Sequence, residues 1–289
     1  MRSLYRKASV LYVPALLLFL CLVVYPFFDG IRISFTNWDG FSQHYSFIGL
    51  RNLSRLVDDE NVRTAFWNTL LYGFGSTFFQ QVLGLGCAIL LDKPFRGRTA
   101  ARTILYLPVL VSAVIMAYMW SYLFEYDGAL NDIVMLAGGE RVLWLSRGNL
   151  AVGVMIAVNT LQYMGVSMVI YMAGLQSIPA VYDEVGQLEG GTRWQLFRKV
   201  TVPLLYPAFV TSITVNLIGG LKLFDIIRAL TNGGPGYKTH SLSTLIYSSY
   251  FESQLAGFAS AVGLLLFVTV LFCALALQAF FRRVEVTLS

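Results

Sequence analysis

Six long apolar stretches alternate with polar loops along the 289-residue chain. They cover residues 10–28, 65–91, 104–124, 150–175, 204–229 and 259–281. A helix needs about 20 apolar residues to cross the hydrocarbon core of a bilayer, and each stretch is close to that length or longer. The pattern therefore predicts an all-α membrane protein with six transmembrane helices, folded as a single domain over residues 1–289.

The first apolar stretch follows Arg2, Arg6 and Lys7, as the apolar core of a secretory signal peptide does. A signal peptide ends in small residues at its cleavage site, whereas this stretch ends in the bulky Tyr25-Pro26-Phe27-Phe28. We therefore expect a retained membrane helix.

The distribution of Lys and Arg predicts the orientation of the six helices. With the N-terminus in the cytoplasm, twelve basic residues fall in cytoplasmic segments and seven fall in the longer outer loops. Cytoplasmic loops of membrane proteins carry the excess of Lys and Arg. Both termini and the polar segment 179–203 are therefore expected in the cytoplasm.

The composition supports this class and excludes others. The chain is 56% hydrophobic and 13% charged, against about 25% charged residues in soluble domains. Its net charge of +5 comes from basic residues scattered over short loops, so we expect no nucleic-acid partner. The three cysteines lie in apolar stretches without a CxxC pair, and the two histidines are isolated, so neither a disulfide framework nor a metal site is expected.

The polar segment 179–203 has the pattern of two short amphipathic helices. Apolar residues recur at helical spacing on both sides of Gly190-Gly191, namely Val181, Val185 and Leu188 before it and Trp194, Phe197 and Val200 after it. One interpretation is a docking element for a soluble partner, in which Glu184 accepts charge-assisted hydrogen bonds. The other is an interfacial loop whose apolar residues rest on lipid. The residue pattern by itself leaves both open.

This segment resembles the EAA loop of ABC importer permeases, with the pattern E-A-A-x3-G-x9-I-x-L-P. Glu184 matches the glutamate, Gly190 the glycine, and Val200, Val202 and Pro203 the last three positions. Val185 and Gly186 stand where the family has alanines, which leaves the local fit to the partner open. The resemblance implies that a groove of a separate ATPase receives residues 184–194, including Trp194.

Other motifs extend the resemblance over almost the whole chain, to the carbohydrate-uptake branch that includes maltose, lactose and glycerol-3-phosphate permeases. They are SFTNWDG at 34–40, FIGLRN at 47–52, Asn68-Thr69, Phe224-Asp225, LTNGGP at 230–235 with Thr239, and residues 257–261. The resemblance implies a type I ABC importer permease fold in a bacterial inner membrane and the import of a sugar or oligosaccharide by alternating access. The implied partners are a second permease, a dimeric ABC ATPase and an extracytoplasmic solute-binding protein.

The chain carries no phosphate-binding loop of its own, because the dipeptide Gly-Lys of the GxxxxGK[ST] motif never occurs. Both histidines lie in outer loops, so no Ser-His-Asp set is expected either. We therefore expect a translocation subunit that is not an enzyme and has no cofactor, with ATP and magnesium on the partner ATPase.

Polar residues near the membrane midplane are costly and are candidates for function. With a helical rise of about 1.5 Å per residue, Asn159, Gln162 and Asn216 lie about 14 to 18 Å from the nearer ends of their helices. Asn159, Gln162 and Tyr163 share one helix face. Amides beside an aromatic ring suit a neutral sugar, so these four residues are candidate solute contacts. The alternative is that the amides join helices, as Gln80 and Gln81 are expected to do.

Two further groups of residues lie toward the outer side. Lys222, Asp225 and Arg228 have a spacing that favours an ion-paired set near the interface, with an outer gate or a site for a charged sugar as the alternative. The loop residues Asn232, Gly233, Gly234 and Pro235 must form irregular backbone, which either contacts a solute-binding protein or simply connects two helices.

Two other classes of function predict different features. An ion-coupled secondary transporter predicts buried midplane carboxylates and two related halves, and neither pattern is present in the apolar stretches. A scaffold that only anchors an ATPase would not need the midplane amides. Stimulation of ATP hydrolysis by solute distinguishes a transporter from such a scaffold.

The predicted orientation can be tested at Gln187. In a Gln187→Cys variant, a membrane-impermeant thiol reagent should label the introduced thiol only from the cytoplasmic side of sealed vesicles, because segment 179–203 is expected there. Labelling of this position from the outer side would overturn the topology.

Overall fold

A computed structural model describes residues 12–288 of the chain as helices joined by loops. The predicted first two residues of the first helix, 10 and 11, and the basic residues Arg2, Arg6 and Lys7 lie outside the described part. Within it, four helices are long and apolar enough to cross a membrane, or up to six if two bent helix pairs each count as one span. The only extended pairing described there is an isolated bridge between Thr36 and Phe47.

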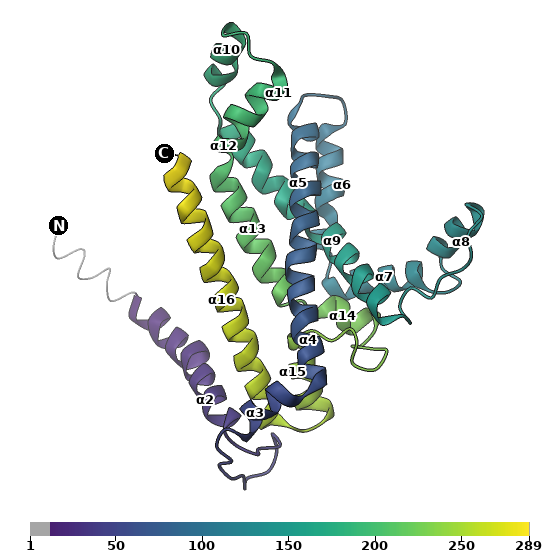
Figure 1. The fold of residues 1–289 in the computed structure, drawn as a ribbon, viewed down its shortest axis with the longest axis vertical. Helices are drawn as coiled ribbons and strands as arrows, with labels where there is room; N and C mark the ends of the chain where they lie inside the picture. The colour runs from purple at the N-terminus through teal and green to yellow at the C-terminus, as the bar shows by residue number, and fades with distance from the viewer. Residues whose placement is uncertain (1–11, 289) are drawn as a thin grey trace, which may run out of the picture. The chain divides into compact units, whose positions relative to one another are not determined.

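The helices follow one another as labelled in Figure 1. Their bounds in chain order are α2 (Tyr25–Ser34), α3 (Arg51–Asp58), α4 (Glu60–Leu70), α5 (Ser76–Asp92), α6 (Arg98–Leu110), α7 (Ala113–Phe124), α8 (Ala129–Leu136), α9 (Gly148–Ser177), α10 (Val181–Leu188), α11 (Arg193–Leu196), α12 (Val202–Leu204), α13 (Tyr206–Leu221), α14 (Asp225–Leu230), α15 (Leu242–Tyr247) and α16 (Ala256–Leu288). π-Helical turns at Leu20–Val24, Leu71–Gly75 and Phe197–Thr201 join adjoining helices, and another at Ser248–Glu252 extends α15.

The chain divides into two compact units, of which the first comprises Met1–Arg63 and Leu245–Phe267. Its loop after α2 is held by Asn52, which is 8% exposed. The Asn52 amide nitrogen donates to the main-chain oxygens of Ser34 and Thr36, both at 2.8 Å. The N–H of Gly257 donates to the oxygen of Trp38 at 2.9 Å. These bonds fasten the loop to the start of α16 within this unit.

The same loop contains a tight turn at Asp39. Its carboxylate accepts hydrogen bonds from the N–H groups of Ser42 and Phe41 at 2.8 and 2.9 Å. Hydrogen bonding to the charged form lowers the pKa of the Asp39 carboxyl below its usual value. The turn therefore keeps its hydrogen-bonded form at neutral pH.

The second unit comprises Thr64–Thr244 and Val268–Ser289 and is built around three helices, α5, α9 and α13. Figure 1 shows α10 and α11 at one end of this unit and α14 toward the other. The contact of α5 with α9 is the most extensive. At Gly84 a Cβ atom would overlap Ser167 and lie 3.0 Å from the backbone nitrogen of Met168. The close approach of these two helices therefore needs a glycine at this position.

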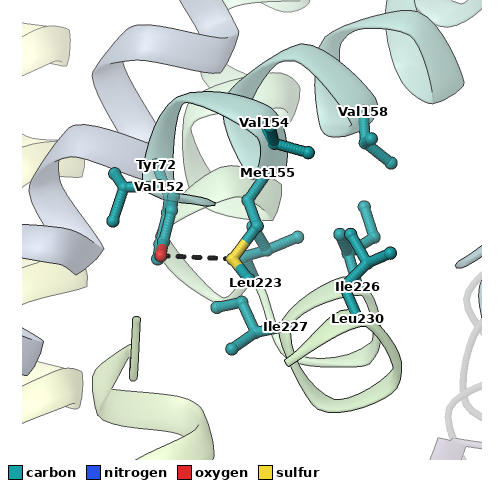
Figure 2. Packing of buried hydrophobic residues seen from close by; sticks show 9 residues of the cluster. All are labelled: Tyr72, Val152, Val154, Met155, Val158, Leu223, Ile226, Ile227 and Leu230. Atoms are coloured by element: carbon teal, nitrogen blue, oxygen red, sulfur yellow. Dashed lines mark hydrogen bonds between the residues drawn. The ribbon is translucent and has the colours of Figure 1, made fainter. Parts of the chain in front are cut away.

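A compact apolar core lies between α9 and α14 (Figure 2). Tyr72 reaches into it from the π-helical turn before α5 and donates its hydroxyl hydrogen to the main-chain oxygen of Thr239 at 2.9 Å. Its oxygen also lies 3.3 Å from the sulfur of Met155. The ring therefore adds both apolar packing and a tether for the loop that follows α14.

The third predicted helix, over 104–124, is not continuous. α6 and the helical segment from Ala113 to Leu136 meet at a bend of 102°. Between them, Val111 has an extended backbone conformation and Ser112 a non-helical one. Pro108 in the last turn of α6 cannot donate a backbone hydrogen bond, which weakens the helix just before the break.

The fifth predicted helix, over 204–229, is also interrupted. Its start is bent by 63° between the segments Arg193–Leu204 and Tyr206–Leu221, where Pro207 lacks the N–H that would continue the ladder. Its end unwinds at residues 222–224 before α14 begins at Asp225. Apolar composition alone does not reveal either interruption.

Much of the surface of the long helices consists of large apolar side chains. Leu16, Leu18, Phe272 and Leu275 are each more than half exposed. Such a surface is unfavourable in water and is what hydrocarbon tails would cover. The exposed faces therefore agree with a protein that lies in a bilayer.

The packing of α5 on α9 can be tested with two glycines of the same helix. Gly84→Ala should destabilise the fold by about 1–3 kcal/mol, because the new methyl group meets the backbone of α9. Gly86→Ala is the matched control, since a Cβ there meets nothing within 4 Å and alanine raises helix propensity by about 1 kcal/mol. Thermal unfolding of the two variants in detergent measures the difference. Equal melting temperatures would contradict the close contact.

Candidate functional site

A cavity of about 310 Å³ lies in the second unit, among α5, α9, α13 and the unwound segment 222–224. Its polar lining residues come from three separate parts of the sequence. They are Gln80, Asn159, Tyr163, Asn216, Lys222 and Asp225. The rest of the wall is apolar residues and glycines, so the cavity presents a few polar groups in a largely apolar surrounding.

The structure brings three of the four predicted solute contacts to this cavity. Asn159 and Tyr163 lie one turn apart on α9, and Asn216 reaches it from α13. Gln162 is 1% exposed and lies outside the lining. Its side-chain oxygen has no hydrogen-bond partner among the described residues. The shared helix face predicted for Gln162 thus does not place it in this cavity.

Gln80 is a lining residue that the sequence interpretation assigned to helix packing. It is 1% exposed, and its amide nitrogen donates to the main-chain oxygen of Asn159 at 3.0 Å. Its oxygen has no partner among the described residues. The rule that singled out Asn159, a polar residue deep in an apolar stretch, applies equally to Gln80 and could have found it.

The predicted charged residues lie at the border of two neighbouring cavities. Among residues 12–288, no salt bridge joins Lys222 to Asp225. Lys222 and Asp225 are exposed at the edge of the cavity, whereas Arg228 donates to the side-chain oxygen of Asn232. Asp225 also lines a neighbouring cavity of about 310 Å³ with Arg228 and Asn232. The three residues therefore border the cavities on one side.

The loop after α14 is tied to α4 by main-chain acceptors. The Asn68 amide donates to the oxygens of Lys238 and His240 at 2.8 and 3.0 Å. The N–H of Leu242 donates to the hydroxyl of Thr69 at 2.9 Å. The matched dipeptide Asn68-Thr69 thus has a structural role in holding this loop.

In the loop itself, the four predicted binding-protein contacts differ in their exposure. Asn232 and Pro235 are exposed, Gly234 is half-buried and Gly233 is buried. Gly233 packs against the His240 ring so closely that a Cβ would overlap it. Only part of the predicted set is therefore open to a partner.

The predicted docking segment folds into α10 and α11, joined by a defined turn. Gly190 has a φ of +78°. The N–H of Gly191 donates to the oxygen of Gly186 at 2.9 Å and that of Gly190 to Gln187 at 3.0 Å. These two bonds and the left-handed residue form a Schellman motif, which ends α10.

The second helix of the segment begins with a capping box. The Thr192 hydroxyl accepts from the N–H of Gln195 at 3.3 Å, and the Gln195 side chain accepts from the N–H of Thr192 at 2.8 Å. This exchange satisfies two backbone donors at the helix start. The turn between α10 and α11 is therefore specified by local hydrogen bonds on both sides.

The outer face of the docking segment is apolar and carries one acidic group of interest. Val185, Leu188 and Trp194 are 48%, 87% and 68% exposed, and Glu184 is exposed beside them. Pro203 begins the continuation into α12. The exposed apolar side chains suit either of the surroundings predicted from the sequence, a protein groove or lipid.

Gly186 faces the opposite way from Val185, toward the inside of the segment. A Cβ at Gly186 would overlap the side chain of Leu196, which is 8% exposed. The glycine at this position therefore accommodates the packing of α10 on α11. Of the two positions where the family has alanine, only Val185 alters the outer face.

The fold and the polar cavity define a helical membrane protein with a solute-sized polar site, as expected of a permease. The chain belongs to the family described as binding-protein-dependent transport system inner membrane component, whose profile matches residues 80–286. It is thus a translocation subunit of the ABC transporter permease class with the type I importer fold.

Its relatives are permeases of solute uptake systems. A "Probable starch degradation products transport system permease protein" of Thermoanaerobacterium thermosulfurigenes is 34% identical over 264 residues, covering 89% of this chain and 87% of the relative. The trehalose/maltose transport system permease protein of Thermococcus litoralis is 30% identical over 271 residues, covering 92% of each chain.

Two solved structures share the fold over almost the whole chain. One is a bacterial ABC transporter involved in the import of the acidic polysaccharide alginate, with a TM-score of 0.84, 25% identity and 98% coverage of both chains. The other is the alginate transporter in complex with its alginate pentasaccharide-bound periplasmic protein, with a TM-score of 0.83, 26% identity and coverage of 98% of this chain and 96% of that chain.

The turn at Gly190 can be tested by a single methyl group. Gly190→Ala should raise the free energy of the folded segment by about 1–2 kcal/mol, because a left-handed conformation is strained for alanine. Trypsin should then cleave at the exposed Arg193 about 5 to 30 times faster. Gln187→Ala, at an exposed position of α10, is the control and should leave the cleavage rate unchanged. An unchanged rate in Gly190→Ala would contradict the turn.

Proposed function

We propose that this chain is the transmembrane permease subunit of an ABC importer that moves a sugar or oligosaccharide into the cytoplasm. The observation that carries the proposal is the cavity lined by Gln80, Asn159, Tyr163 and Asn216 inside an apolar helix bundle. Amides donate to and accept from hydroxyl groups, and the Tyr163 ring offers a surface for the CH faces of a sugar. The names of the starch-product, trehalose/maltose and alginate relatives support a carbohydrate solute.

In the proposed topology each bent helix pair is one span, so that the chain of 289 residues crosses the inner membrane six times as a single domain. The excess of Lys and Arg supports a cytoplasmic location for both termini and for α10 and α11. The cavity is then reached from alternate sides of the membrane in turn.

The energy for this movement comes from a separate dimeric ATPase that holds ATP and magnesium, while this chain binds no cofactor. The segment of α10 and α11 docks in a groove of that ATPase. Val185, Gly186, Gly190 and Trp194 shape the contact, Glu184 accepts hydrogen bonds from a basic residue there, and Pro203 leads into the membrane. The exposure of Val185, Leu188 and Trp194 supports this contact.

Two other partners complete the proposed importer. A second, homologous permease closes the translocation pathway, and an extracytoplasmic solute-binding protein delivers the solute to the loop at residues 232–235. The periplasmic protein bound in the alginate transporter supports the latter. Lys222, Asp225 and Arg228 border the outer side of the cavity and act there as a gate.

The assembly is tested by affinity purification of the full chain from its native membrane. An ATPase and a second permease should copurify, and neutral oligosaccharides should stimulate ATP hydrolysis by the reconstituted complex. A chain that transports solute without an ATPase would overturn the proposal.

The docking role is tested at Glu184. Glu184→Ala should lower solute-stimulated ATP hydrolysis and uptake about tenfold or more, because a hydrogen bond to a charged group contributes about 1.5–3 kcal/mol. Glu189→Ala removes an exposed carboxylate from the end of the same segment and should change uptake less than twofold. Normal uptake by the Glu184→Ala complex in vesicles would remove Glu184 from the docking surface.

A further inference from the structure

The buried amides of the cavity are held in one orientation by main-chain acceptors. The Gln80 nitrogen lies 3.0 Å from the main-chain oxygen of Asn159. A main-chain carbonyl can only accept, so the NH₂ group must be on that side and the Gln80 oxygen on the other. That oxygen is buried without a partner among the described residues, although Gln80 lines the cavity.

Asn216 is oriented by the same rule. Its NH₂ group donates to the main-chain oxygen of Ser212 at 2.8 Å and to the hydroxyl of Ser167 at 2.9 Å. The hydrogen-bonding capacity of the nitrogen is therefore used within the protein. The side-chain oxygen is what Asn216 has left to offer to a solute in the cavity.

A buried network behind the cavity keeps Asn216 in this orientation. The oxygen of Gln81 accepts from the hydroxyls of Tyr171 at 2.5 Å and Ser212 at 2.7 Å. Its nitrogen lies 3.5 Å from the Ser167 hydroxyl. Because Ser212 donates to Gln81, its oxygen is free to accept from the Asn216 nitrogen, 3.4 Å away. The Ser212 hydroxyl hydrogen is thus directed to Gln81, and the Asn216 nitrogen faces the hydroxyl oxygens of Ser167 and Ser212.

The charged groups at the cavity do not offset these two acceptors with a net positive charge. Lys222 and Asp225 line the cavity with opposite charges, and both are exposed, whereas Gln80 and Asn216 are buried. Asn159 makes no side-chain hydrogen bond among the described residues and can either donate or accept. The Tyr163 hydroxyl can also donate or accept, so the lining combines two adaptable groups with two fixed acceptors that need a donor, while Lys222 and Asp225 cancel in charge.

We propose that this cavity selects a neutral, hydroxyl-rich solute and discriminates against acidic sugars, unlike the alginate transporter whose fold it shares. Gln80 and Asn216 are the specificity-determining acceptors, and Gln81 is a positioning residue that acts through Asn216. A hydroxyl donates to each fixed oxygen, whereas a carboxylate loses its water and meets two acceptors that cannot turn. The inference rests on the proposed function.

The selectivity is measured on the complete permease–ATPase complex in nanodiscs without a solute-binding protein, so that binding reports on the membrane cavity. Titration calorimetry with maltotriose, xylotriose and mannotriose is compared with trigalacturonate and trimannuronate. At least one neutral trisaccharide should bind about tenfold more tightly than both acidic ones.

The three outcomes separate the two proposals. Tighter binding of an acidic trisaccharide, through Lys222 for example, overturns the selectivity while a sugar importer remains supported. Absence of binding by all five overturns the carbohydrate function itself and this inference with it. Preferential binding of a neutral trisaccharide supports both.

The positioning role is tested by Gln81→Met, which keeps the volume of the side chain and removes both its acceptor and its donor. The Ser212 hydroxyl then loses its acceptor and can donate to the Asn216 oxygen in a turned amide, which competes with the bond from the amide nitrogen to the Ser212 main-chain oxygen, so the ratio of neutral to acidic affinity should fall. A purely structural loss would weaken all trisaccharides alike and leave the ratio unchanged, and that result overturns the role. Gln278→Met, at an exposed position of α16, is the control and should preserve the ratio.

Discussion

The contact of α5 with α9 at Gly84 is the constraint on which the polar interior of the second unit depends. A glycine there lets the two helices approach so closely that Gln81 can reach Ser167 on α9 and Ser212 on α13. Buried amides and hydroxyls are costly in an apolar bundle unless each finds a partner. The helix spacing and the hydrogen-bond network therefore require each other, and the cavity lies directly beside them.

The docking segment, by contrast, is held by hydrogen bonds between residues that are close in sequence. Its turn is specified by the left-handed Gly190 and by the capping box of Thr192 and Gln195, all within a few residues of sequence. Its two helices also pack on each other, with Leu196 against Gly186, so this contact too lies within the segment. Its exposed apolar face is left for another surface, and in the proposed importer that surface is the ATPase.

These two parts are joined by one continuous segment, which supports the proposed coupling between them. α11, α12 and α13 follow each other with a bend of 63° near Pro207, and α13 carries Asn216 into the cavity. A displacement of the docking segment would thus act on the same helix that holds a solute contact. The unwound residues 222–224 follow the end of that helix and, with Asp225, line the same cavity.

The sequence by itself determined the class of protein, because apolar length and the spacing of glycine and capping residues are local properties. It indicated the membrane helices, the two short helices around Gly190-Gly191, and Asn159, Tyr163 and Asn216 as polar groups at depth. Tertiary structure decided which of these polar groups meet: Gln162 lies on the neighbouring face, Gln80 joins the cavity, and Lys222 and Asp225 are not paired with each other. It also decided the breaks near Pro108 and Pro207 and the orientation of each buried amide. The contacts and amide orientations depend on main-chain oxygens and helix surfaces that are distant in sequence, whereas the prolines near the breaks and the depth of Gln80 are visible in the sequence.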